Sequence, residues 1–174
     1  NQPPVNNSLN QCSATVNFPA PTATDNCGPI TPVAITPTGP LFNVGVHTVI
    51  YTATDNAGNT SSCSFTVTVN DNQAPLLSCP SNIAVGTDAP ACTALVGSGL
   101  NATISDNCTY TLTHELNGVT TLAPTAGQLG SYTFNEGVTT VTYVANDGVN
   151  PPVNCSFTVT VSDDDAPTIT TGAG

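Results

Sequence analysis

The sequence contains no Lys and no Arg, so its 11 Asp and Glu residues leave a formal net charge of -11 at pH 7. Binding to nucleic acid depends on Lys and Arg side chains that neutralise phosphates. The same absence argues against holding a phosphorylated substrate or binding an anionic membrane surface. No apolar stretch approaches the ~20 residues of a membrane span. We therefore expect no nucleic-acid partner and no insertion into a membrane.

Charged side chains of either sign are scarce, at 6% of the 174 residues, against a usual ~25%. Surface polarity must come from uncharged side chains, of which there are 30 Thr, 19 Asn and 12 Ser. Thr and Val favour strands, whereas Asn, Gly and Pro favour turns. No stretch shows sustained helical periodicity. The composition therefore predicts an all-β fold.

Seven Cys in a chain of this size indicate an oxidising compartment. A structural zinc site would need C-x-x-C pairs, and the sequence has none. Disulfides are the better explanation, and we expect the protein to be extracellular or on a cell surface.

The chain repeats itself. Cys63–Val69 recurs unchanged as Cys155–Val161, at an offset of 92 residues. The same offset relates Phe42–Asp55 to Phe134–Asp147, where most of the matched residues agree. A match of this length predicts two tandem modules.

An earlier motif shows where the two copies differ. Asp25–Cys27 recurs as Asp106–Cys108 at the shorter offset of 81, so the second copy carries about 11 extra residues. We interpret Asn1–Pro4 as linker, because it resembles Asn72–Pro75, and the opening strand of the first module as shortened. The predicted bounds are 1–71 for the first module, 72–165 for the second with an insertion near 109–133, and 166–174 for the start of the next linker.

Two strands are visible within the first module. Val49, Tyr51 and Ala53 alternate with Ile50 and with Thr residues, and Phe65 and Val67 alternate with Thr residues, in the period of two that is typical of a half-buried strand. The sequence Asn-Ala-Gly-Asn between them, at 56–59, predicts a turn. Several short strands in under 100 residues favour a β-sandwich.

The motifs occur in a fixed order in both copies. Asp-Asn-Cys is followed by Phe-x-x-Gly-x-x-Thr-Val-x-Tyr-x-Ala-x-Asp, then by Cys-Ser-Phe-Thr-Val-Thr-Val-x-Asp and Ala-Pro, and Cys79-Pro80 opens the second copy. This set resembles the hyalin repeat (HYR) domain family over nearly the whole chain. The first copy departs from the family because it lacks the Cys-Pro of the opening strand, and the second because of its insertion.

The resemblance implies two tandem immunoglobulin-like or fibronectin-III-like β-sandwiches. The family occurs in extracellular proteins and serves adhesion, and in bacteria it forms long arrays in very large surface proteins. In such a fold the Tyr of the Tyr-x-Ala-x-Asp motif would anchor a corner near the penultimate strand.

The immunoglobulin-like order also implies a pairing of the cysteines. Four Cys in the second module allow three connectivities. The order of strands favours Cys108–Cys155 and Cys79–Cys92, and by the same logic Cys27–Cys63 in the first module. Cys12 is then unpaired. It is either a free thiol, or a Cys whose partner lies outside the given sequence, or a cross-link to another chain.

Carboxylates are predicted to converge where a linker meets the next module. In an immunoglobulin-like domain the end of the second strand, the last turn and the incoming linker lie at one end, and oxygen ligands on convergent loops suit Ca²⁺. The linker also resembles that of cadherins, an analogy only. The alternative is that these side chains simply cap turns through bonds to the backbone. The predicted calcium ligands are Asp71, Asn72, Asp106, Asn107, Asn146 and Asp147.

Other chemistry is weakly indicated. His47 and His114 do not occupy matched positions, and Glu115 and Glu136 are the only residues that offer a Glu pair for glycoside hydrolysis. We therefore expect no enzyme but a structural or adhesive module of a stalk or surface filament, whose partners are further repeats or copies of itself. The alternative is a module that binds a glycan or a receptor through the 109–133 insertion.

Overall fold

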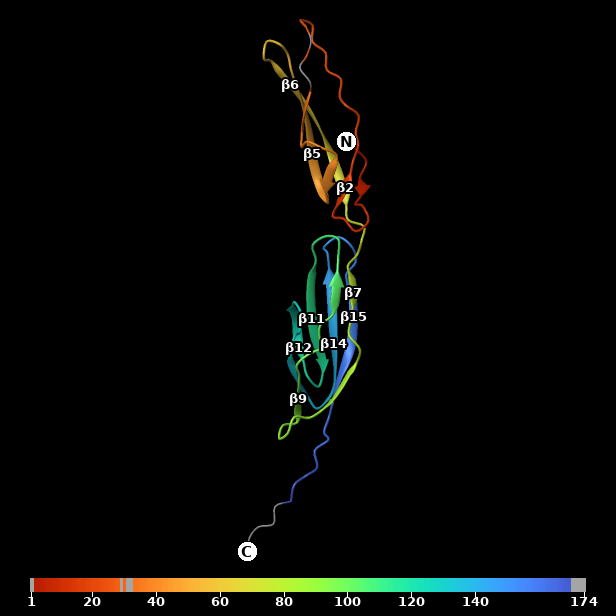
Figure 1. Cartoon of the computed structure of the whole chain (residues 1–174), viewed down its shortest axis with the longest axis vertical. Coiled ribbons are helices and arrows are strands. Elements are labelled where there is room, and N and C mark those ends of the chain that lie inside the picture. The colour runs from red at the N-terminus through yellow and green to blue at the C-terminus, as the bar shows by residue number, and fades with distance from the viewer. Residues whose placement is uncertain (1, 29, 31–32, 170–174) are drawn as a thin grey trace. The chain divides into compact units, whose positions relative to one another are not determined.

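The structure, a computed structural model, describes residues 2–28, 30 and 33–169. The chain divides into two compact units, Asn1–Gln73 and Ala74–Gly174 (Figure 1), where the sequence predicts a border after residue 71. The described residues form strands and turns without any helix, so the predicted all-β fold class is confirmed. Accordingly, the described part of the chain has no long apolar helix of the kind that crosses a membrane.

The first unit consists of a four-stranded sheet, in the order β1-β6-β5-β3, and a two-stranded sheet of β2 and β4. Its core contains apolar residues from both sheets, such as Phe42 of the smaller sheet and Val49 of the larger. The strands that the described residues of this unit form are β1 (Val5–Asn6), β2 (Ser13–Thr15), β3 (Ala34–Thr36), β4 (Leu41–Asn43), β5 (Gly45–Thr54) and β6 (Thr60–Asn70).

The hairpin of β5 and β6 confirms the two predicted strands. The strands pair in antiparallel register, and the alternation buries Val49 and Val67, at 0% and 1% exposure, while the intervening Thr residues lie outside the core. The connecting turn contains Gly58, whose φ of 91° few other residues adopt. The predicted turn at 56–59 is therefore present.

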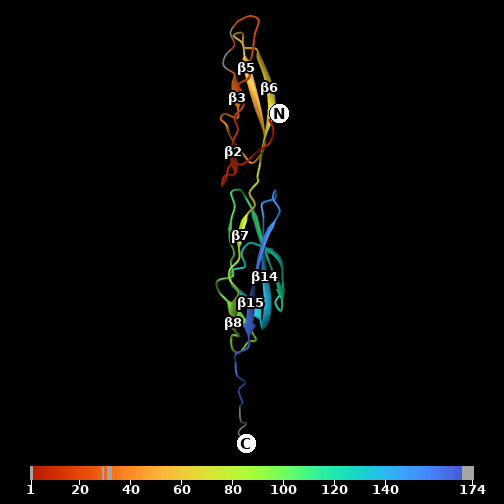
Figure 2. The ribbon, with the colours of Figure 1, turned by 90° about the vertical axis from the view of Figure 1, so that its right-hand side faces the viewer.

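The second unit repeats this plan with more strands. A five-stranded sheet has the order β12-β11-β14-β15-β8, and the pairs β10-β7 and β13-β9 lie opposite it (Figure 2). Its strands are β7 (Leu76–Ser78), β8 (Ile83–Gly86), β9 (Thr93–Val96), β10 (Thr103–Ser105), β11 (Thr111–Gly118), β12 (Leu122–Ala126), β13 (Tyr132–Asn135), β14 (Gly137–Asn146) and β15 (Val153–Ser162).

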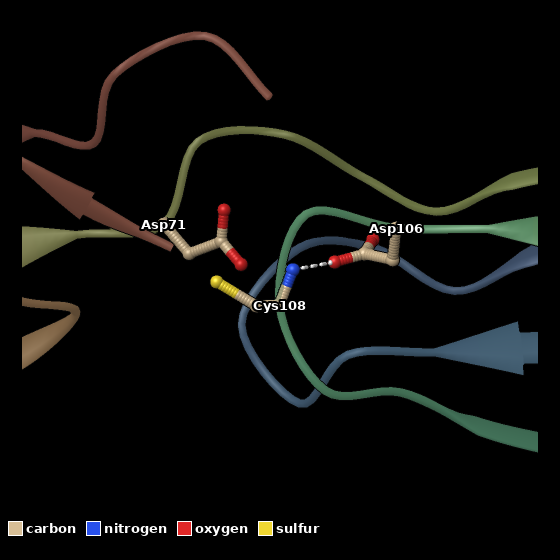
Figure 3. Close-up of side chains that lie close together, drawn as sticks. All are labelled: Asp71, Asp106 and Cys108. Carbon is tan, nitrogen blue, oxygen red and sulfur yellow. Dashed lines mark hydrogen bonds between the residues drawn. The ribbon is translucent and has the colours of Figure 1, made fainter. Parts of the chain in front are cut away.

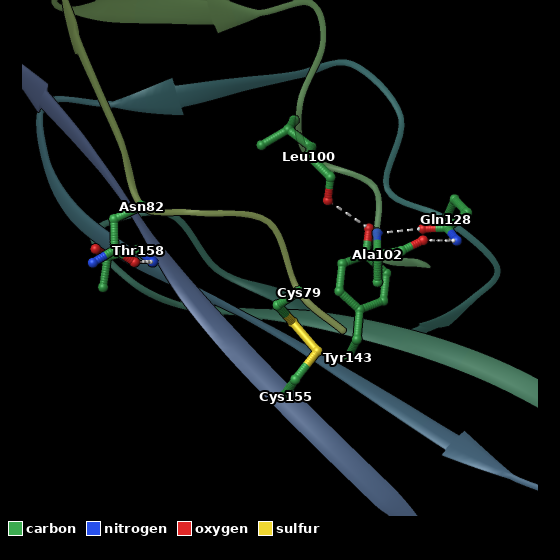
Figure 4. Close-up of a disulfide and its surroundings, with 8 residues drawn as sticks. All are labelled: Cys79, Asn82, Leu100, Ala102, Gln128, Tyr143, Cys155 and Thr158. Atoms are coloured by element: carbon green, nitrogen blue, oxygen red, sulfur yellow. Dashed lines mark hydrogen bonds between the residues drawn. A yellow bond between two sulfur atoms is a disulfide. The ribbon is translucent and has the colours of Figure 1, made fainter. Parts of the chain in front are cut away.

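The second unit is an immunoglobulin-like sandwich. Val96 and Phe134 of the smaller sheets and Val141 and Val159 of the larger sheet share one core. Tyr143, on the penultimate strand, is fully buried, and its hydroxyl donates to the Leu100 carbonyl at 3.0 Å (Figure 4). This Tyr anchors a connection between the sheets, as the resemblance implies.

The predicted insertion lengthens one strand and adds another. In the first unit the short β3 pairs with β5, and in the second the longer β11 takes the same place beside β14. Most of the 109–133 segment forms β11 and β12, which pair with each other, so that β12 becomes the edge of the larger sheet.

The strand β1 corresponds to β8. β1 pairs in parallel with β6, with Val5 opposite Val69, as β8 pairs with β15, with Val85 opposite Val161. This register aligns residues 2–4 with residues 82–84. The interpretation of the first residues as a linker was therefore wrong, because it rested on a four-residue likeness that strand pairing overrides.

Candidate functional site

The Asp-Asn-Cys motif forms the same tight turn in both units. An Asp25 carboxylate oxygen accepts a hydrogen bond from the Cys27 main-chain N–H at 3.0 Å. The Asp106 carboxylate accepts from the Cys108 N–H at 2.6 Å (Figure 3). A short acidic side chain two residues before a free N–H is the local arrangement that stabilises such turns.

The turns between the last two strands of each unit use Asp in the same way. One Asp55 oxygen accepts from the N–H groups of Ala57 and Asn59, at 2.9 and 2.8 Å, and the other accepts from the Asn59 amide at 2.8 Å. The Asn59 side chain and these N–H groups hold the pKa of Asp55 below its ordinary 3.8. Both carboxylate oxygens of Asp55 are therefore occupied within the turn.

The second unit reproduces this cap. The Asp147 carboxylate accepts from the N–H groups of Val149 and Asn150, each at 2.8 Å, and from the Asn150 amide. Burial alone would raise the pKa of Asp147, but the hydrogen bonds outweigh it and the pKa lies below 3.8. Asn146 likewise accepts from the Gly148 N–H through its side-chain oxygen.

Asp71 and Asn72 are held by a residue that the sequence analysis did not select. The amide of Asn7, a buried side chain, donates to Asp71 at 3.3 Å, and its oxygen accepts from the Asn72 N–H at 3.2 Å. Asn7 also donates to the Gln11 carbonyl. No spacing rule selects one Asn among 19, so only the structure identifies this role.

Among the predicted calcium ligands, Asp106 differs from the residues that cap turns with all of their side-chain oxygens. The carboxylate of Asp147 and the side-chain oxygen of Asn146 accept hydrogen bonds within a turn, which agrees with the alternative that these side chains are turn caps. In Asp106, by contrast, the Oδ2 atom is buried and has no hydrogen-bond partner among the described residues. Asn107 lies beside it, and its amide donates to the Cys108 sulfur at 3.2 Å. An unpaired carboxylate oxygen fits a cation ligand.

The second unit contains a disulfide between Cys79 and Cys155, with 5.7 Å between the Cα atoms (Figure 4). The predictions Cys79–Cys92 and Cys108–Cys155 were therefore wrong. Cys155 lies near the start of β15, whereas the Cys92 carbonyl accepts from the Glu136 N–H, beside the end of β15. Cys79 follows β7, which packs near the start of β15, so Cys92 is out of its reach.

The remaining cysteines also depart from the predictions. Cys27 and Cys63 are both free and exposed, so the predicted Cys27–Cys63 pair was wrong, and Cys92 is free as well. Cys27 lies beside the tip of the β5–β6 turn, and Cys63 lies further along β6. Cys12, predicted to be unpaired, is disulfide-bonded. The immunoglobulin-like order was too coarse to find these positions.

Both histidines contact main-chain carbonyl groups of neighbouring segments. A ring nitrogen of His47 contacts the Asn43 carbonyl at 2.7 Å, and that of His114 contacts the Gly127 carbonyl at 2.8 Å. Glu115 lies opposite Thr142 of β14, and Glu136 directly precedes β14. The six residues of strand from position 136 to position 142 span about 20 Å, so the main chains of Glu115 and Glu136 lie about that far apart. Glycosidases need carboxyl groups roughly 5–10 Å apart.

Comparison with known proteins identifies relatives of both units. Residues 5–69 match the family model described as HYR domain. Hyalin of Strongylocentrotus purpuratus is 35% identical over 155 residues, which cover 86% of this chain and 12% of that protein. Hyalin of Lytechinus variegatus is 32% identical over 153 residues, covering 84% of this chain and 26% of that protein.

A shorter match is to the sushi, von Willebrand factor type A, EGF and pentraxin domain-containing protein 1 of Mus musculus, 43% identical over 70 residues. These cover 38% of this chain and 2% of that protein. The chain thus spans only a small part of the length of each relative.

Proposed function

Because this chain belongs to the HYR family, we propose that it is a load-bearing structural module of an extracellular protein, forming part of a stalk or a cell-surface filament. Its partners would be further repeats of the same chain or copies of itself. The observation that carries the proposal is the parallel pairing, in each unit, of a strand near the start with the last strand.

In the first unit this pairing joins β1 to β6. Val5 lies opposite Val69, the Gln2 N–H donates to the Thr66 carbonyl at 3.1 Å, and the Asn7 N–H donates to the Asn70 carbonyl at 2.9 Å. A pull on the two ends of the unit acts along parallel strands in opposite directions. The hydrogen bonds between them then share the load and must break together, which resists force.

The strands of the second unit pair in the same way, and a covalent bond carries the load there before the pairing does. β8 pairs in parallel with β15, and the Thr87 N–H extends the pairing to the Ser162 carbonyl at 3.1 Å. Cys79 precedes β8 and is bonded to Cys155 in β15. A pull on the ends of this unit would pass through the disulfide, so most of the sandwich would carry no load.

Pulling geometry tests the proposal directly in the first unit. We would pull single molecules in reductant, once between the start of the chain and residue 73, and once between the start and a tag inserted at the exposed Ala57. In the second geometry β1 and β6 are pulled from the same end, so their bonds open one at a time. We expect a clearly higher unfolding force in the first geometry, and equal forces would refute load bearing through this pairing.

An extracellular location follows from the same proposal. The Cys79–Cys155 disulfide persists in an oxidising compartment. Mass spectrometry of the protein from its natural source would find this bond, and a reduced pair there would contradict the location. No catalytic role is part of the proposal, and the side chains of His47 and His114 each contact a main-chain carbonyl.

We propose further that Ca²⁺ binds at Asp106, whose buried Oδ2 has no hydrogen-bond partner among the described residues. A ligand that binds only the folded state raises the melting temperature. We expect millimolar Ca²⁺ to stabilise the protein relative to EDTA, and an Asp71→Ala/Asp106→Ala variant to lack the rise. An Asp25→Ala variant is the matched control and should keep it. If Ca²⁺ shifts none of them, the carboxylates are turn caps alone.

The second candidate function is binding of a glycan or a receptor by the insertion. One observation favours it: Tyr110, with 42% of its surface exposed, borders a hollow of about 300 Å³ together with polar groups. Exposed aromatic rings stack on the apolar faces of sugars. A glycan array should give a signal that Tyr110→Ala removes, and an array without any signal would reject this candidate. The hollow is lined by Thr109, Tyr110, Thr111, Asn146, Asp147 and Gly148.

A further inference from the structure

The hollow beside Tyr110 lies in the second unit, between the start of β11 and the turn that follows β14. Residues 109–111 line one side of it, and residues 146–148 line the other. The Thr111 hydroxyl donates to the Asn146 carbonyl at 3.0 Å, so a hydrogen bond joins the two sides. The two walls of the hollow are therefore fixed to each other.

The hollow combines an aromatic ring with polar groups that can bind a ligand. Tyr110 is 42% exposed. Its hydroxyl and the amide nitrogen of Asn146 have no hydrogen-bond partner among the described residues, whereas the Asn146 side-chain oxygen accepts from the Gly148 N–H at 2.8 Å. A sugar has apolar C–H faces and a rim of hydroxyl groups, so an exposed ring beside unused polar groups suits it.

A fixed negative charge also lines the hollow. Burial alone would raise the pKa of Asp147, but hydrogen bonds from Val149 and Asn150 hold it below 3.8, so this carboxylate is ionised at neutral pH. Like charges a few ångströms apart repel strongly enough near a protein surface to decide between ligands. The sequence contains no Lys or Arg that could neutralise an anionic ligand. The charge of the hollow therefore disfavours anions.

The first unit has a hollow at the matching place, with the charge but without the ring. Its volume is about 270 Å³, and Gly28 and Asp55 are among the residues that line it. These two residues match Thr109 and Asp147 at the repeat offsets of 81 and 92. The residue of the first copy that matches the tyrosine is Pro29. The first unit therefore serves as an internal control for the contribution of the ring.

We propose that the hollow beside Tyr110 binds neutral glycans and rejects those that carry sulfate or carboxylate groups. A hexose would stack an apolar face on the Tyr110 ring and form hydrogen bonds with the Asn146 amide and the tyrosine hydroxyl, while Asp147 repels an acidic sugar. This inference rests on the glycan-binding candidate proposed above and names the class of glycan that the site takes.

The test is a glycan array that carries neutral oligosaccharides, each beside a sulfated form of the same backbone. The full chain is applied in EDTA, so that no metal ion can bridge an acidic glycan to the carboxylates. We expect signal on neutral glycans, and the sulfated form of the best of them should bind about tenfold or more weakly, which corresponds to ~1.4 kcal/mol. In 1 M salt this difference should shrink, because the Debye length falls from about 10 Å at 0.1 M to about 3 Å.

Variants separate the ring from the charge. Tyr110→Ala should weaken binding of the neutral glycan about tenfold or more, whereas Tyr110→Phe should keep most of it. Val149→Ala is the matched control for the ring, because Val149 is 61% exposed but does not line the hollow. Asp147→Asn keeps a side-chain oxygen for the turn and should bring the sulfated form closer to the neutral one in affinity.

Titration followed by backbone amide NMR locates the binding. The signals of residues 109–111 and 146–148 should shift with the best neutral glycan, and those of residues 55–57 in the first unit should not. Equal binding of neutral and sulfated forms would overturn the inference and leave glycan binding in place, whereas an array without any signal would reject both. Binding that Tyr110→Ala leaves unchanged would also overturn the inference, because the glycan would then lie elsewhere.

Discussion

Removing the Cys79–Cys155 bond should destabilise the second unit and leave the first unchanged. The perturbation is the double variant Cys79→Ser/Cys155→Ser. The bond spans a sequence separation of 76 residues, and in the chain-entropy model a loop of that size restricts the unfolded state by about 4.5 kcal/mol. Native-state adjustments usually reduce this effect, so we expect a loss of at least about 2 kcal/mol in the free energy of unfolding.

The assay must read the two units separately, because two units need not unfold in one step. Urea denaturation followed by backbone amide NMR does so, with signals of β14 for the second unit and of β5 for the first. Cys63→Ser is the matched control, since Cys63 occupies the repeat position of Cys155 and is a free thiol. We expect it to change either unit by less than about 0.5 kcal/mol.

Two results would refute this reasoning. One is a loss in the second unit below about 1 kcal/mol, which would mean that the bond hardly restricts the unfolded chain. The other is a loss of equal size in the first unit, because the described bond lies entirely within residues 79–155.

Three further predictions concern single side chains. Tyr143→Phe should cost the second unit about 1–3 kcal/mol in urea unfolding, because two main-chain hydrogen bonds to a buried hydroxyl are lost; an unchanged midpoint would contradict this. The hydrogen bond from the Asn59 side chain lowers the pKa of Asp55, so the stability that this carboxylate contributes is complete above pH 3.8 and disappears as the pH falls through the folded-state pKa. In the Asp55→Asn variant the melting temperature of the first unit should therefore fall less steeply as the pH is lowered, and an unchanged fall would speak against the cap. Asn7→Ala should destabilise the first unit by about 2 kcal/mol, since it removes the donor to a buried carboxylate; urea unfolding read at β5 would check it.

The fold was predictable because the strands carry period-two patterns and the modules repeat. Alternation around Val49 and Val67 fixed which face of β5 and β6 is buried, and the turn at 56–59 followed from its Asn and Gly residues. The register of β1 was not predictable in the same way. Two residues are too few for a pattern, and only pairing with Val69 and Asn70 assigns them.

The disulfides were mispredicted because sequence order does not say which strand covers which. Cys155 points to the inner side of β15, and its partner Cys79 directly follows β7, the strand packed near it, rather than lying in the strand that an average immunoglobulin-like order suggests. The turn residues were easier. Asp147 and Asp55 act on their own neighbours within four residues, so local sequence is sufficient to predict their caps.

The central claim, that the chain is a load-bearing module, is tested most directly by the length that the second unit releases under force. We would pull the full chain by its ends in a Cys12→Ser/Cys108→Ser background, with and without reductant, so that Cys79–Cys155 is the bond under study. With the bond intact, the 76 residues it spans cannot extend, and reduction should release about 260 Å more. An equal extension in both conditions, or unfolding of either unit at negligible force, would contradict the account.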